Sequence, residues 1–145
     1  MKTVHFKASN FEGECIVDEE FAPLLLQMND IAVKHNMVVI VTSSLRKDTH
    51  VSGAIVTPAQ MSNHLIGHAI DCNVRSKGTG EFFNSKKIGD GTGPDELFFE
   101  DVDRNTDLRW GQAFNKPDSV HFDDAINIKK AVAWKEKFND LHNMA

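Results

Sequence analysis

The sequence predicts an α+β fold, with a small antiparallel sheet flanked by helices. Two segments, one in each half of the chain, carry apolar residues at the spacing of an amphipathic helix. Short β-branched or alternating runs lie between them, and such runs are typical of strands. Because these strands do not alternate with helices of similar length, the pattern favours a small antiparallel sheet over a doubly wound parallel one.

Residues 18–35 are predicted to form the first long helix. This segment opens with three acidic residues, which suit the positive end of a helix dipole, and its apolar residues recur at helical spacing. Residues 37–41 form a β-branched run that is typical of a buried strand. Residues 42–60 are polar and interrupted by serine, glycine and proline, which predicts a loop.

In the second part of the chain, the alternating residues 68–74 predict a strand. Five glycines within residues 75–93 predict a long surface loop. The other expected elements are a short helix, two short strands and a second long helix, at residues 94–103, 107–110, 120–122 and 124–142.

The composition limits the class of protein. The chain has 145 residues, 41% of them hydrophobic, which suits one domain spanning residues 1–145. Its net charge of -5 argues against a nucleic-acid binder, which needs an excess of Lys and Arg for phosphate contacts. No apolar run approaches the roughly 18 residues of a membrane span, and residues 1–7 do not resemble a secretory signal.

Cysteine is sparse, because Cys15 and Cys72 are the only two in the chain. Their number excludes a disulfide framework and an all-thiolate zinc site. We expect two small buried thiols, and a single bridge between the two residues is the alternative.

Residues 62–71, Ser-Asn-His-Leu-Ile-Gly-His-Ala-Ile-Asp, carry candidate metal ligands. His64 and His68 would share one face of a helix, as in the HExxH zinc motif, but the glutamate of that motif is missing. Gly67 also costs a helix about 1 kcal/mol. A strand is the favoured interpretation, in which alternation points Asp71 away from His68. A turn at Gly67 would then let His64 meet Asp71.

A catalytic metal needs a third protein ligand, and His121 is the candidate. It lies between apolar residues in a predicted short strand, so it enters the core from a distant part of the chain. Two histidines and one aspartate would leave a fourth position for water. Asp118, three residues before His121, is placed to accept a proton from that water.

These residues form two motifs that resemble a known family. The first has the form Ser62-x-His64-x-x-Gly67-x-Ala69-x-Asp71, and the second is Asp118-x-x-His121. Together they resemble the zinc D-Ala-D-Ala carboxypeptidase and L-alanyl-D-glutamate endopeptidase family, which has the Hedgehog/DD-peptidase fold and includes phage endolysins. All five fixed positions of the first motif match.

The resemblance implies a role for each matched residue. It makes His64, Asp71 and His121 the ligands of one Zn²⁺ ion and Asp118 the general base. Ser43-Ser44-Leu45-Arg46 looks like the family's Ser-Gly-Tyr-Arg segment, which makes Arg46 a catalytic and substrate-binding candidate. Ser62 of the first motif and Trp110 of a Leu-Arg-Trp-Gly segment are further substrate-binding candidates.

The function implied is that of a zinc metallopeptidase that cleaves the peptide stems of peptidoglycan. We expect a phage-type L-alanyl-D-glutamate endopeptidase, with a D-Ala-D-Ala carboxypeptidase as the alternative within the family. A non-catalytic zinc-binding interaction module is the alternative from another class. We expect a monomer that accumulates in the cytoplasm and reaches the cell wall or periplasm after delivery.

Other polar residues are interpreted as structural. His68 is expected to be structural or to lie at the rim of the site, and the remaining histidines are expected at the surface: His5, His35, His50 and His142. The acidic residues of the 90–107 region are interpreted as a solvated loop, since no EF-hand spacing is present.

Overall fold

The computed structural model describes residues 1–46, 61–88 and 93–142. The strands in this part of the chain are β1 (Thr3–His5), β2 (Phe11–Glu12), β3 (Ile16–Asp18), β4 (Met37–Ser43), β5 (Ala69–Ser76), β6 (Phe82–Phe83), β7 (Arg109–Trp110) and β8 (His121–Asp123). The helices are α1 (Ala22–His35), α2 (Pro94–Asn105), α3 (Ile126–Lys129) and α4 (Ala131–His142), with short 3₁₀ turns η2 (Asn63–Ile66) and η3 (Gly111–Ala113).

The main sheet has the strand order β2-β4-β5-β8-β7, and β6 pairs with β5. All of its pairs are antiparallel except β2 with β4, which run parallel. The α+β class is therefore confirmed, whereas the prediction of a purely antiparallel sheet was wrong for the pair of β2 and β4. The chain can make the parallel pair because α1 lies between the two strands and carries the chain back along the sheet.

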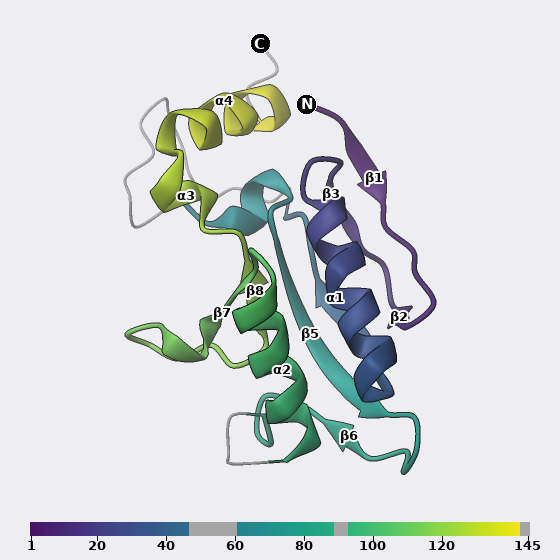
Figure 1. The fold of residues 1–145 in the computed structure, drawn as a ribbon. Coiled ribbons are helices and arrows are strands. Elements are labelled where there is room, and N and C mark those ends of the chain that lie inside the picture. Colours follow the sequence, from purple (N-terminus) through teal and green to yellow (C-terminus); the bar gives the residue numbers. More distant parts are fainter. Residues whose placement is uncertain (47–60, 89–92, 143–145) are drawn as a thin grey trace.

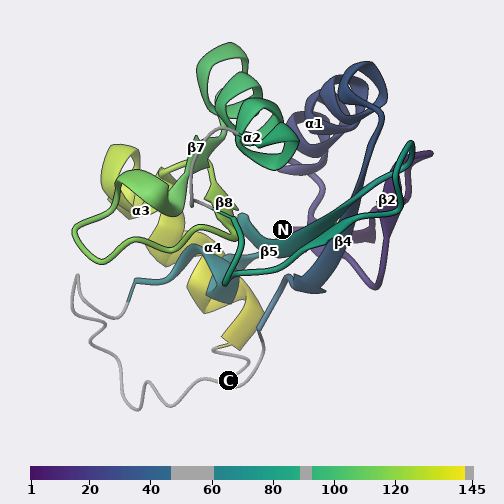
Figure 2. The same ribbon diagram turned by 90° about the horizontal axis from the view of Figure 1, so that it is seen from below.

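One face of the sheet is covered by α1 and α2, which lie side by side (Figures 1 and 2). Strand β5 shows why: its residues Ile70, Cys72 and Val74 are fully buried, while the residues between them are only partly buried. This alternation confirms the predicted two faces of the strand and leaves Asp71 on the face away from α1 and α2.

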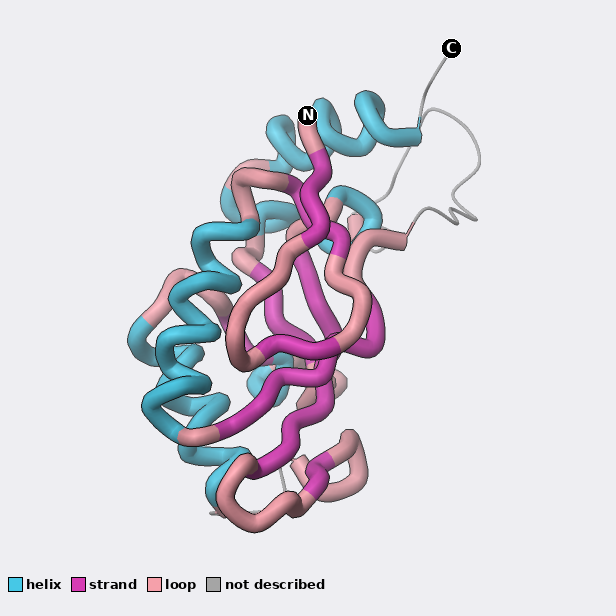
Figure 3. Tube along the Cα trace, turned by 90° about the vertical axis from the view of Figure 1, so that its right-hand side faces the viewer, coloured by secondary structure: helices cyan, strands magenta, loops and turns pink. Residues whose placement is uncertain are grey.

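A second, smaller hydrophobic cluster lies apart from this core. It joins the turn η2 to the C-terminal helices, and its members are Met61, Leu65, Ile66, Ile126, Trp134 and Phe138. Figure 3 shows α4 at the end of the molecule where the chain begins, and the amino group of Met1 pairs with Asp140 at 2.8 Å. None of the helices in the described ranges is long and apolar enough to span a membrane.

Several predicted boundaries needed correction. The first helix begins at Ala22 rather than at Asp18, because Asp18 belongs to β3 and pairs with Thr3. The predicted helix over residues 124–142 is divided into α3 and α4 at Lys130, whose backbone is not helical. Strand β5 extends two residues further than predicted, and β6 lies within the predicted loop.

Candidate metal centre

The turn that carries His64 is built by its own sequence. Ser62 caps η2, since its Oγ accepts a hydrogen bond from the backbone N–H of His64 at 3.3 Å. Gly67 ends the turn in the left-handed region, with φ of 72°. A Cβ at Gly67 would lie 2.6 Å from the backbone nitrogen of Asp18, so only glycine fits this close approach. The serine and the glycine of the first motif are thus explained by the turn.

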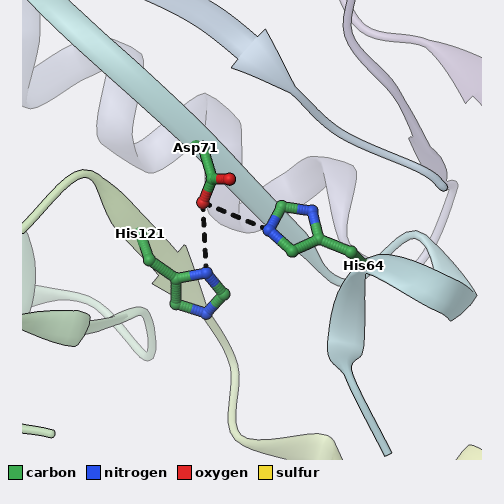
Figure 4. Close-up of side chains that lie close together, drawn as sticks. All are labelled: His64, Asp71 and His121. Carbon is green, nitrogen blue, oxygen red and sulfur yellow. Dashed lines mark hydrogen bonds and ion pairs between the residues drawn. The ribbon is translucent and has the colours of Figure 1, made fainter. Parts of the chain in front are cut away.

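Three side chains from different elements meet at one point (Figure 4). His64 comes from η2, Asp71 from β5 and His121 from β8. Oδ1 of Asp71 lies 3.2 Å from Nε2 of His64 and 3.3 Å from Nδ1 of His121. The antiparallel register places Asp71 directly opposite His121. One candidate ligand atom from each residue lies within 4.8 Å of those from the other two.

The outer nitrogen of each imidazole has an acceptor that fixes the ring. Nδ1 of His64 donates to the carbonyl oxygen of Ser44 at 2.8 Å, and Nε2 of His121 donates to the Asp123 carboxylate at 2.7 Å. In a neutral ring, the nitrogen that faces Asp71 then keeps its lone pair. Two lone pairs and a carboxylate oxygen therefore converge, and this donor set fits a divalent metal such as zinc.

The charges of the cluster also favour a bound cation. Burial lowers the pKa of His121, but hydrogen bonds to Asp123 and Asp71 outweigh it and raise that pKa to about 9. Burial raises the pKa of Asp71, but its bonds to His121 and His64 reverse this and hold it well below its ordinary value. The centre is therefore stabilised by a positive charge, which a proton or a metal ion can supply.

Asp123 is a site residue that the sequence analysis missed. Its carboxylate is 2% exposed and binds His121, the guanidinium of Arg109 (2.6 and 3.2 Å) and the backbone N–H of Ala125. The sequence does carry a signal for this contact. Residues two apart in a strand share a face, and Asp123 follows His121 by two positions.

Arg46 lies beside the cluster, and its contact with substrate stays a prediction. Its Nη2 donates to Oδ2 of Asp71 at 3.2 Å, and its side chain is 51% exposed. The backbone also ties it to the site, since its N–H donates to the carbonyl of His64 at 2.9 Å. Arg46 thus has donors both toward a proposed metal ligand and toward solvent.

Asp118 lies in the exposed turn before β8. Its backbone N–H donates to Gly111 at 2.9 Å, and its carbonyl accepts from the N–H of His121 at 3.2 Å. A Cβ at Gly111 would lie 2.4 Å from that carbonyl oxygen, so the glycine permits the turn. Within the described ranges, the carboxylate of Asp118 has no hydrogen-bond partner, and its role as the general base stays a prediction.

Trp110 and Ser62 both make contacts that support the local backbone. Trp110 is buried against Phe99, and its indole N–H donates to the carbonyl of Ser119 at 2.7 Å, which supports the turn that carries Asp118. Ser62 caps η2, as described above. Their contact with substrate stays a prediction.

Other predicted structural residues had mixed outcomes. His68 is structural: it is buried and bonded to Asp18 and Asp124 at 2.6 and 2.7 Å. His35 and His142 were expected at the surface, but each is half-buried and has a hydrogen-bond partner. Within the acidic region, two residues are buried on α2 rather than solvated in a loop, Asp95 and Glu96. His50 and Asp90 lie outside the described residues.

The two cysteines are buried and free, so the expected buried thiols are found and the alternative bridge is absent. Burial raises the pKa of Cys15 to about 12 and moves that of Cys72 in the same direction. Neither thiol is a ready nucleophile or metal ligand at neutral pH.

The fold and the cluster place candidate metal ligands on one face of a small sheet, an arrangement that suits a metal-dependent hydrolase. Comparison with protein families supports this class: residues 56–124 match the family described as D-alanyl-D-alanine carboxypeptidase. The matched segment contains both motifs, and it confirms the resemblance found in the sequence. A comparison with curated proteins gave no match.

Proposed function

We propose that this protein is a zinc-dependent peptidase that cleaves the peptide stems of peptidoglycan. The observation that carries the proposal is the convergence of His64, Asp71 and His121 within the segment that matches a peptidase family. Its supporting features are the acceptors that orient both imidazoles and the unbonded carboxylate three residues before His121. We propose the L-alanyl-D-glutamate bond as the one that is cut.

The three ligands would hold one zinc ion, which supplies a Lewis acid for the scissile carbonyl and lowers the pKa of a water to about 7. Asp118 accepts a proton from the water whose oxygen attacks the carbonyl carbon. As the C–N bond breaks, Asp118 returns that proton to the leaving amine. Arg46 binds a substrate carboxylate or the scissile carbonyl through its exposed donors.

The D-Ala-D-Ala carboxypeptidase is the second candidate, and the matched family's description favours it. A carboxypeptidase must bind a free terminal carboxylate, and Arg46 offers a half-exposed guanidinium beside the ligand cluster. An endopeptidase would use the same group for a carboxylate or carbonyl within the stem. The two candidates therefore share the metal centre and differ in the product.

Digestion of purified Gram-negative peptidoglycan, with and without a chelator, tests the proposal. Mass spectrometry of the products should reveal chelator-sensitive new N-termini at D-glutamate. Loss of one D-alanine from the stem would instead establish the carboxypeptidase. If no chelator-sensitive product forms although the protein binds zinc, the chain is a non-catalytic zinc-binding module and the proposal is wrong.

A further inference from the structure

We infer that the C-terminal helices α3 and α4 position the metal ligand His64, through Asn127 above all, so that metal affinity depends on their docking. This inference rests on the proposed metal centre. The two helices lie beyond residue 124, where the family match ends. They nevertheless contact the turn that carries His64 along its whole length.

The turn η2 is held by polar contacts on both sides of His64. Asn127 of α3 donates from Nδ2 to the carbonyl of Met61 at 3.0 Å and accepts from Nδ2 of Asn63 at 3.0 Å. Its backbone N–H also donates to Oδ1 of Asn63 at 3.2 Å. Asn63 is 2% exposed, so water does not compete for these bonds.

Helix α4 adds two further contacts to the same turn. The indole N–H of Trp134 donates to the carbonyl of Ser62 at 3.3 Å, and the imidazole of His142 donates to the carbonyl of Leu65. The residues immediately before and after His64 are therefore each bonded to a C-terminal helix. The imidazole of His64 itself is directed to Ser44 and Asp71.

The hydrophobic contacts also separate His64 from the other two ligands. Leu65 and Ile66 pack with Trp134 and Phe138 in the small C-terminal cluster. Ile70 and Phe122, which flank the other two ligands, pack in the main core. The neighbours of His64 in sequence thus belong to one cluster, and those of Asp71 and His121 belong to the other. A shift of α3 and α4 against the sheet would move His64 away from its two partners.

This arrangement makes Asn127 a positioning residue. It does not touch the ligand atoms, but it fixes the backbone from which His64 extends. Loss of outer contacts of this kind lowers metal affinity by roughly 10–100-fold. By linkage, a bound metal must in turn strengthen the docking of the helices.

The test compares zinc affinity, measured by competition with a chromophoric chelator, in the full-length wild type, Asn127→Ala and Ile128→Ala. Ile128 is the matched control, because it is the next residue in α3 and is 69% exposed. We expect about a 10-fold loss of affinity in Asn127→Ala and no change in the control. Far-UV circular dichroism verifies that each variant is folded.

Two more measurements keep the inference testable if Asn127→Ala folds poorly. Trp134→Phe keeps an aromatic ring to stack on Phe138 and removes the bond to Ser62 together with part of the buried indole, and it should weaken zinc binding several-fold. Hydrogen exchange should show that zinc slows exchange of the α4 amides in the wild type.

The outcomes separate this inference from the proposed function. If the wild type binds zinc and both variants bind it as tightly as the control does, the inference is overturned and the metal centre stands. A wild type that binds no zinc would overturn the metal centre, and the inference with it.

Discussion

At the scale of single residues, the partners of each side chain set its expected chemistry. Asp118 is exposed and unbonded within the described residues, whereas Asp71 and Asp123 are bonded to histidine and arginine. Three aspartates of the same region therefore differ in their partners. Asp118 presents its carboxylate to solvent, whereas Asp71 and Asp123 stay ionised because their bonds to histidine and arginine lower their pKa values.

Asp118→Asn should abolish proton transfer without removing the metal. We expect hydrolysis of peptidoglycan to fall by about 10²- to 10⁴-fold, because the amide cannot accept the proton of water. Zinc content, measured by atomic absorption, should stay at the wild-type level. Asp107→Asn serves as the control at an exposed carboxylate. Unchanged hydrolysis in Asp118→Asn would exclude Asp118 as the base.

Asp123→Asn should weaken metal binding through His121. The amide is a poorer acceptor for Nε2 of His121, so the ring loses the contact that orients it. We expect zinc affinity to fall by roughly 10–100-fold in a chelator competition. Glu100→Gln, at a partly exposed ion pair of α2, should bind zinc as the wild type does. Equal affinities in the two variants would show that Asp123 does not act on the metal centre.

At the scale of elements, two glycines with the same backbone conformation form a matched pair. Gly67 and Gly80 have φ of 72° and 74°, but a Cβ at Gly80 would meet nothing within 4 Å. Gly80→Ala should therefore cost about 1 kcal/mol of stability, for the left-handed conformation alone. Gly67→Ala adds the clash with Asp18, and we expect about 3 kcal/mol or more.

Urea unfolding of the two variants measures this difference. A larger loss at Gly67 supports the close approach of η2 to β3, and the same variant should bind zinc more weakly because His64 moves with the turn. Equal losses in the two variants would mean that the chain relaxes around the new methyl group at little cost.

Among the elements themselves, sequence patterns predicted the long ones and the short strands β7 and β8, but missed the short strands β1, β2, β3 and β6. Helix α1 and strand β4 have enough residues for a period to be recognised. Strands β1, β2 and β3 have two or three residues each, which is too few for any period. The ends of elements also depended on distant partners, as at Asp18, where pairing with Thr3 outweighed the helical pattern.

For the whole molecule, a bound metal should stabilise the fold, because the ligands come from three separate elements. At zinc concentrations about 100 times Kd, the gain is about 2.7 kcal/mol. That corresponds to a rise in Tm of about 5–10 °C for a chain of this size. Scanning calorimetry with and without chelator measures it. His121→Ala should show no rise, and a rise in that variant would place the zinc elsewhere.

Acid should destabilise the molecule through Asp18, which joins β3 to His68 and to Lys137 of α4. Burial raises the pKa of Asp18, but bonds to His68 and Lys137 outweigh it and lower the pKa from 3.8 to about 2. The stabilisation is therefore present above pH 4 and is lost as the pH falls through 2. Its size is about 2 kcal/mol.

Urea unfolding between pH 6 and pH 2 tests this dependence. The wild type should exceed Asp18→Asn in stability above pH 4, and the difference should shrink as the pH falls. Glu20→Gln is the control, because Glu20 shares Lys137 with Asp18 but is 67% exposed. A difference that persists undiminished at pH 2 would show that the charge of Asp18 is not its cause.

The sequence by itself determined the kinds of chemistry and their order along the chain. Ser62, Gly67 and Asp71 form a local unit, since a capped turn followed by a strand fixes the ligand positions within ten residues. Alternation in β5 correctly placed Asp71 on the face opposite Ile70 and Cys72. These features depend on near neighbours, and near neighbours are what a sequence pattern records.

Only the tertiary structure decided which atoms meet. Asp71 and His121 are 50 residues apart, and their contact depends on the register of β5 with β8. The outer partners of the imidazoles, Ser44 and Asp123, likewise follow from packing. So does the support of His64 by Asn127, from 63 residues away in sequence. Contacts between distant segments depend on how two cores and a sheet fit together, and no local pattern encodes that fit.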